Sequence, residues 1–150
     1  MPNPLVINGL DELRALTGQE VGASEWITIT QELIDRFADV TGDHQWIHVD
    51  TTRARRESQF GTTIAHGFLT VSLLPRLIQE TIEVRDNFKM RVNYGFNRLR
   101  FVSPVPAGAK IRARFNAQKV SENEVTWLVT VDVEGSQKPA LVAEWIGKFY

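Results

Sequence analysis

The segment His66-Gly67-Phe68-Leu69-Thr70-Val71-Ser72-Leu73-Leu74-Pro75-Arg76-Leu77-Ile78-Gln79-Glu80-Thr81 is the most apolar part of this chain. Its apolar residues recur at three- and four-residue spacing on both sides of Pro75, which predicts a helix. A helix that is apolar on nearly every face is one that other elements surround. We expect Pro75 to kink this helix, because proline removes one backbone donor and clashes with the preceding turn.

Beyond about residue 87 the apolar residues recur at every second position, as they do in strands with one buried face. The alternation runs over residues 88–96, 111–117, 125–133 and 141–149, with turn-forming residues between these ranges. Four long strands joined by short turns predict an antiparallel meander. The helix from His66 is the element apolar enough to cover it, so the predicted fold class is α+β: an antiparallel β-sheet wrapped around a central buried α-helix.

Shorter elements are expected ahead of this helix. The patterns favour a short helix over 11–16, a strand over 26–30 and an exposed polar helix over 50–59. Thr30 can cap a further helix with an apolar stripe. Gly42 can end that helix, because glycine adopts the left-handed conformation without steric cost.

Length and composition favour one globular domain over residues 1–150, since 43% of the residues are apolar and 23% are charged. The net charge of -1 gives no drive toward nucleic acid or an anionic membrane. The absence of cysteine excludes disulfides and thiolate chemistry. The start, Met1-Pro2-Asn3-Pro4, lacks the features of a signal peptide, and no apolar run approaches the roughly 20 residues that span a bilayer. We expect a cytoplasmic domain with no nucleic-acid or membrane partner.

Titratable residues are concentrated in Thr41-Gly42-Asp43-His44-Gln45-Trp46-Ile47-His48-Val49-Asp50, which contains two of the three histidines. On a continuous helix Asp43 and His48 would point away from each other, but across a turn after Gly42 they can converge on one water molecule. A carboxylate and an imidazole, with ordinary pKa values of about 3.9 and 6.5, can both move protons near neutrality. His44, His48 and Asp50 can also be read as metal ligands. We expect no metal, because the sequence has no second ligand cluster.

The order of elements and three sequence matches resemble the MaoC-like, (R)-specific enoyl-CoA hydratase family of the hot-dog fold, in its single-domain, nodulation-protein-N-like form. The family's motif runs Ser/Thr-Gly-Asp-x-Asn-Pro-aliphatic-His, and residues 41–48 match it except that Gln45-Trp46 replaces Asn-Pro. The other two matches are Ile64-Ala65-His66-Gly67-Phe68-Leu69, and Tyr94-Gly95 leading to Arg100-Phe101-x-x-Pro104-Val105.

The resemblance implies that Asp43 and His48 deliver water to C3 of a trans-2-enoyl thioester, reversibly and without a cofactor. Which of the two is the base and which the acid stays open. It also implies that the backbone N–H of Gly67 binds the thioester oxygen. His66 either contacts the substrate or shapes the loop through a hydrogen bond. Asn97, in a strand near the expected pocket, either contacts the substrate or is a surface amide.

For partners, the resemblance implies an acyl-CoA or acyl-carrier-linked thioester as substrate, and a homodimer in which two sheets join edge to edge. Two other functions remain as alternatives. A hot-dog acyl-CoA thioesterase is opposed by the Gly-Asp-x-x-x-x-His spacing. A non-catalytic acyl-thioester-binding subunit is opposed by the presence of both Asp43 and His48.

Overall fold

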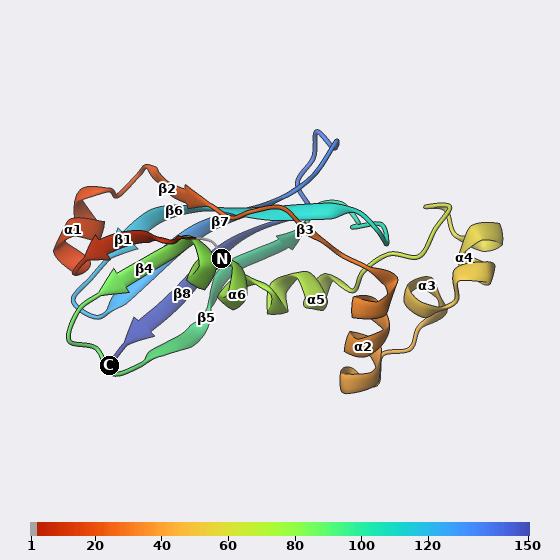
Figure 1. Cartoon of the computed structure of the whole chain (residues 1–150), viewed down its shortest axis with the longest axis horizontal. Helices are drawn as coiled ribbons and strands as arrows, with labels where there is room; N and C mark the ends of the chain where they lie inside the picture. The colour runs from red at the N-terminus through yellow and green to blue at the C-terminus, as the bar shows by residue number, and fades with distance from the viewer. Residues whose placement is uncertain (1–2) are drawn as a thin grey trace.

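The computed structural model describes residues 3–150, in which eight strands and six helices are found (Figure 1). In chain order they are β1 (Leu5–Asn8), α1 (Leu10–Ala15), β2 (Glu20–Ala23), β3 (Ile27–Thr28), α2 (Gln31–Thr41), α3 (Trp46–Val49), α4 (Thr51–Glu57), α5 (Gly67–Ser72), α6 (Leu74–Thr81), β4 (Ile82–Arg85), β5 (Arg91–Phe101), β6 (Lys110–Val120), β7 (Glu124–Val133) and β8 (Leu141–Phe149). Met1 and Pro2, part of the stretch used to argue against a signal peptide, lie outside the described residues. Within residues 3–150 no helix is long and apolar enough to cross a bilayer. The expectation of one domain over 1–150 stays a prediction.

The main sheet has the strand order β2-β6-β7-β8-β5, with β3 also paired to β6, and every pairing in it is antiparallel. The predicted meander is correct for β6, β7 and β8 and wrong for β5. That strand pairs with β8 along its whole length, from Arg91 opposite Phe149 to Phe101 opposite Leu141. The reason is the connection over residues 102–109, which carries the chain from one side of the sheet to the other instead of closing a hairpin.

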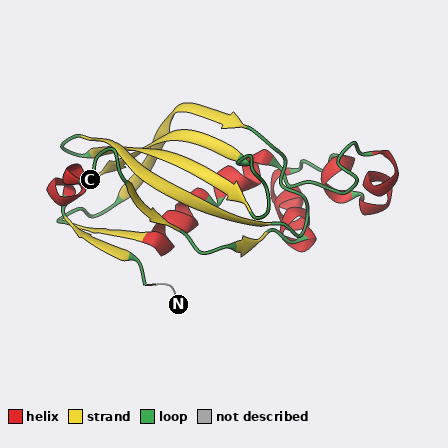
Figure 2. Ribbon diagram, turned by 90° about the horizontal axis from the view of Figure 1, so that it is seen from above, coloured by secondary structure: helices red, strands yellow, loops and turns green. Residues whose placement is uncertain are grey.

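The alternating apolar residues of β6, β7 and β8 point to one face of the sheet and are buried there, as predicted: Ile111, Ala113, Phe115, Ala117, Val125, Trp127, Val129, Val131, Val133, Leu141, Ala143, Trp145 and Phe149. Helices α5 and α6 lie against this face (Figures 1 and 2). The α+β class and the helix covering the sheet are therefore confirmed.

The predicted helix over 66–81 is divided into α5 and α6, with Leu73 at the junction. Pro75 lies in the first turn of α6, where a missing backbone donor is tolerated. Leu69, Leu74 and Leu77 are buried, but 67% of Phe68 is exposed. The expectation that this helix is surrounded on every face is wrong in the single chain, because its first turn borders a cavity.

The predicted helix after Thr30 is α2, whose first turn is capped by the Thr30 hydroxyl accepting from the Leu33 N–H at 3.1 Å. Gly42 ends it in the left-handed conformation, with φ of 81°. The expected polar helix is α4, capped by Asp50, which accepts from the Arg53 N–H at 2.9 Å. Together α2, α3 and α4 project beyond the end of the sheet (Figure 1).

Some short elements differ from the expectation. The predicted strand over 26–30 is reduced to the two residues of β3, and the short strands β1, β2 and β4 were not predicted. β1 and β4 form a separate parallel pair. Four-residue strands carry too little alternation to be recognised in a sequence, and their pairing is decided by tertiary contacts.

Candidate functional site

A cavity of about 420 Å³ lies where the loop after α2, the start of α5 and the end of β5 meet. Its walls are mostly apolar, and they include Phe60, Ile64, Ala65, Phe68, Phe101, Val102, Val105 and Leu141. The polar side chains that line it are Asp43, His48, His66, Thr70 and Ser103. An apolar cavity with a few convergent polar groups has the character of a small-molecule site.

His48 lies on α3 and is 7% exposed. Its Nδ1 is 2.7 Å from the carbonyl oxygen of Ile64, and because a carbonyl only accepts, Nδ1 carries the proton. The other ring nitrogen, Nε2, then carries the lone pair in the neutral ring. Burial lowers the pKa of His48 below its ordinary value, and it outweighs the opposing effect of the Ile64 carbonyl. The ring is thus held neutral with a free proton acceptor.

Asp43 lies in the turn directly after Gly42 and is exposed toward the cavity. Its Oδ1 accepts from the Gln45 N–H at 3.3 Å, which fixes the turn. The stretch 43–48 was expected to be one turn; the structure shows a turn over 43–45 followed by the short helix α3. A carboxylate oxygen of Asp43 and one ring nitrogen each of His48 and His66 lie within 4.8 Å of one another.

His66 is 2% exposed, and its ring stacks on that of His48 with centroids 3.8 Å apart. Its Nε2 donates to the carbonyl oxygen of Asp43 at 2.9 Å. This bond ties the turn after α2 to the start of α5. Nδ1 of His66 is buried and has no hydrogen-bond partner among residues 3–150. Of the two alternatives for His66, the bond to Asp43 corresponds to the one that shapes the loop.

Gly67 is the first residue of α5 and lines the cavity. Within the described chain its N–H has no acceptor. A Cβ placed on Gly67 would lie 2.8 Å from a ring carbon of Phe101. The absence of a side chain therefore lets Phe101 pack against the backbone at the cavity wall.

Three other sequence candidates lie elsewhere. Asn97 is exposed on the edge strand β5, at an irregularity between Phe96 and Arg98, and does not line the cavity. His44 is exposed, with its Nε2 3.0 Å from Asp39, a contact that raises the pKa of His44. Asp50 caps α4. His44 and Asp50 thus make local contacts outside the cavity.

Gln45-Trp46, which replaces the Asn-Pro of the family motif, lies at the start of α3. Gln45 is extended, with φ of −56° and ψ of 137°, and Trp46 begins α3. The guanidinium of Arg53 lies 4.2 Å from the centre of the Trp46 ring. This cation–π contact ties α4 to the start of α3, the helix that carries His48.

Among residues 3–150 one group of side chains, Asp43, His48 and His66, is compact enough to be considered for a metal ion. The two imidazole rings are stacked, with an angle of 21° between their planes. Ring lone pairs lie in the ring planes, and two planes stacked 3.8 Å apart do not meet near the rings, so one ion cannot lie in both planes. In addition, Nδ1 of His48 and Nε2 of His66 are already bound to carbonyl oxygens.

Sequence reasoning missed several lining residues. Phe60, Phe68 and Phe101 form much of the apolar wall, although Phe101 lies inside a motif that the resemblance quoted. The acceptor for His48 is a backbone carbonyl, that of Ile64, which no side-chain pattern can reveal. The match Ile64-Ala65-His66-Gly67 was the available signal that this segment borders the site.

Comparison with known proteins shows the family and the fold of the chain. The sequence model of the family described as 'MaoC like domain' matches residues 12–138. The chain is 50% identical to 3-hydroxyacyl-thioester dehydratase Z of Mycobacterium tuberculosis over 92% of this chain and 93% of that one. It is 46% identical to nodulation protein N of Rhizobium meliloti over 91% of this chain and 88% of that one.

Among solved structures, the unliganded R-hydratase PhaJ1 of Pseudomonas aeruginosa superposes with a TM-score of 0.77. The match covers 94% of this chain and 84% of that one. At 24% sequence identity it shows a shared fold and no more. The fold is the hot-dog fold that the sequence resemblance implied. With a family match over most of the chain, the protein belongs to the MaoC-like domain family.

Proposed function

We propose that this protein is a hydro-lyase that adds water reversibly to a trans-2-enoyl thioester, giving an (R)-3-hydroxyacyl thioester. The observation that carries the proposal is the carboxylate of Asp43 and a ring nitrogen of His48 within 4.8 Å of each other on the wall of an apolar cavity. The 50% identity to a 3-hydroxyacyl-thioester dehydratase over nearly the whole chain supports the reaction class.

In the proposed reaction one water molecule donates hydrogen bonds to the Asp43 carboxylate and to Nε2 of the neutral His48. As the water oxygen bonds to C3, one of these groups takes its proton. A proton is then delivered from the protonated group to C2, so that hydroxyl and hydrogen have been added across the double bond. Dehydration is the reverse. Such acid–base assistance is typically worth about 10²–10⁴ in rate.

Negative charge develops on the thioester oxygen during this step, and the N–H of Gly67 is proposed to bind it. The N–H has no acceptor within residues 3–150, and it belongs to the cavity wall that also holds His66. One such donor typically stabilises a transition state by roughly 2.7–4 kcal/mol. The apolar wall of Phe60, Phe68 and Phe101 would hold the acyl group.

The substrate is proposed to be an acyl thioester on CoA or on an acyl carrier, since both present the same thioester. The protein is proposed to act as a homodimer joined along the β5 edge, which is largely exposed and carries several apolar side chains: Val92, Tyr94, Phe96 and Phe101. A cytoplasmic location stays a prediction from composition. Asn97 lies on this β5 edge and outside the cavity of its own chain. Its proposed contact is with a substrate bound to the partner subunit.

The test is the absorbance of the enoyl-thioester band of crotonyl-CoA, followed together with release of free CoA. We expect the band to disappear without CoA release, and (R)-3-hydroxybutyryl-CoA to be the product. Asp43→Asn and His48→Gln should each reduce this rate by at least a hundredfold while the circular dichroism spectrum is unchanged. CoA release without hydroxyacyl product would identify a thioesterase. If the CoA-linked and the carrier-linked crotonyl thioester both stay unchanged, both catalytic functions would be contradicted.

A further inference from the structure

Gln31, the first residue of α2, contacts the backbone of His48 from outside the cavity. Its side-chain Nε2 donates to the carbonyl oxygen of His48 at 2.7 Å, and its Oε1 accepts from the hydroxyl of Thr63. A carbonyl oxygen can only accept, so the orientation of the amide is fixed. Thr63 is 2% exposed and Gln31 is half-buried, so the contact is partly shielded from solvent.

The His48 ring is oriented by its hydrogen bond to the Ile64 carbonyl. Gln31 contacts the backbone of His48 itself and the side chain of Thr63, the residue before Ile64. Nδ1 of His48 donates to the carbonyl of Ile64, the residue after Thr63, and the Ile64 N–H donates to Ile47 at 3.0 Å. The segments around residues 48 and 64 are thus joined to each other directly. Gln31 joins this pair of segments to the first turn of α2 by hydrogen bonds, while Phe37, further along α2, contacts the His66 ring edge-on with centroids 4.9 Å apart.

α2 is also the helix that ends at the Asp43 turn. Its last residue is Thr41, Gly42 follows in the left-handed conformation, and the carbonyl of Asp43 is held by His66. Because a capped helix is stiff, fixing its first residue against His48 also fixes where its far end places Asp43. We propose that Gln31 is a positioning residue that sets His48 relative to the Asp43 carboxylate. This inference rests on the proposed function, in which those two groups share one water.

The fold itself does not require this amide. The start of α2 is capped by Thr30, and the helix is anchored in the core by Ile34 and Ala38, each with no exposed surface. The amide of Gln31 makes one further contact, from Nε2 to Asp35 at 2.9 Å on the helix surface. Loss of the amide should therefore disturb the site more than the stability.

The test compares Gln31→Ala and the isosteric Gln31→Glu with the control Asp35→Ala, which removes the surface contact and leaves the one to His48. We expect Gln31→Ala to lower kcat at least tenfold with KM within twofold of wild type, since displacements of about 1 Å from a remote change can lower rates by up to a hundredfold. Asp35→Ala should leave both constants unchanged. In Gln31→Glu, kcat relative to wild type should be lowest at neutral pH and recover as the pH falls, because a protonated carboxyl can again donate to the His48 carbonyl.

A second readout does not depend on activity. Imidazole ¹⁵N spectra should show a single Nδ1–H tautomer of His48 in the wild type and in Asp35→Ala, and a mixture of two tautomers in Gln31→Ala. An unchanged His48 spectrum in Gln31→Ala, or a kcat equal to wild type in both Gln31 variants, would overturn the inference. If no variant and no wild type hydrates an enoyl thioester, the proposed function fails, and the spectra alone still decide whether Gln31 positions His48.

Discussion

At the scale of single residues, the burial of His48 sets the pH range in which its ring stays neutral. Its pKa is lowered from the ordinary value of 6.5, because burial disfavours the charged ring. The neutral ring is the form that can accept from water at Nε2. We predict that the acid limb of the kcat/KM profile, which reports the free enzyme, has its midpoint below pH 6.5, measured from pH 4.5 to 8. A midpoint above 6.5 would contradict this environment for His48.

The same shift has a consequence for stability. Between the lowered folded pKa and about 6.5 the unfolded chain binds a proton that the folded chain does not, so this contribution to stability is lost as the pH falls through that window. In His48→Gln that part of the decline should be absent from chemical denaturation curves. The variant is therefore the control for the pH dependence of stability.

A methyl group added at Gly67 is predicted to lower activity. In Gly67→Ala the new Cβ would lie 2.8 Å from the Phe101 ring, and because Phe101 is 51% exposed, its ring can rotate away with little loss of stability. We expect kcat/KM to fall at least tenfold and Tm to change by only a few degrees. The double variant Gly67→Ala/Phe101→Ala removes the clash. If it restores kcat/KM to the level of Phe101→Ala alone, Gly67 serves packing and is not a close-approach site.

Whether a site residue could be predicted from the sequence depends on whether it acts through its side chain or through its backbone. Asp43 and His48 use side-chain chemistry, and they stood out as titratable groups around a helix stop at Gly42. The contacts of Ile64 and Asp43 with the two histidines use backbone carbonyls, which are the same for every residue type. Gln31 and Thr63 are ordinary polar residues in sequence, and only the fold brings them to His48.

At the scale of elements, β2 passes so close to α6 that Gly22 is required. A Cβ on Gly22 would lie 2.8 Å from Cγ2 of Thr81, which is buried and donates from its hydroxyl to the Leu77 carbonyl. We predict that Gly22→Ala lowers the free energy of unfolding by about 1–3 kcal/mol. Urea denaturation measures it, with Gly147→Ala, whose Cβ would make an ordinary contact at 4.0 Å, as the control. Equal stability of Gly22→Ala and wild type would mean that Thr81 can move aside.

Element prediction worked where a periodic pattern is long. β6 and β7 were recognised because inward positions such as Ile111 and Val131 recur at every second residue. The partner of β5 was not recognised, because alternation identifies a strand and not its neighbour. β1 and β4 are four residues each, too short for a pattern to emerge.

At the scale of the whole molecule, the exposed β5 edge presents unpaired backbone groups over eleven residues. If this edge pairs with the same edge of a second copy around a two-fold axis, every substitution in it occurs twice in the interface. We predict a dimer at micromolar concentration by sedimentation velocity, and its dissociation in Val92→Lys, because two like charges would be brought together. Val40→Lys on α2, where Val40 is 86% exposed, is the control and should stay dimeric. A monomeric wild type would contradict the prediction.

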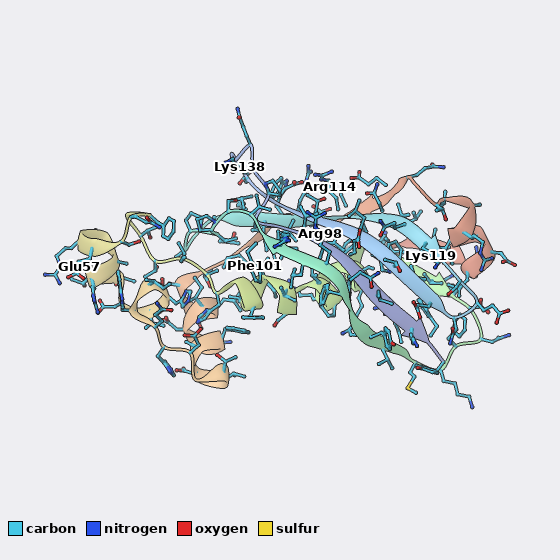
Figure 3. All side chains as sticks on the ribbon, turned by 180° about the vertical axis from the view of Figure 1, so that it is seen from behind. Glu57, Arg98, Phe101, Arg114, Lys119 and Lys138 are labelled. Carbon is cyan, nitrogen blue, oxygen red and sulfur yellow. The ribbon has the colours of Figure 1, made fainter. Side chains whose placement is uncertain are left out.

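The projection of α3 and α4 beyond the sheet has a consequence for heat resistance. Glu57 on α4 and Lys119 on β6 mark opposite ends of the molecule (Figure 3), and α3 and α4 together contribute only His48 and Ala54 to the buried residues. Segments with little buried surface open at a lower free energy than the whole domain. Half-inactivation should therefore occur several degrees below the midpoint of sheet melting by circular dichroism, and brief proteolysis in that interval should cut within residues 50–62. Durability of this catalyst would then be improved by reinforcing α4, with no change to its core.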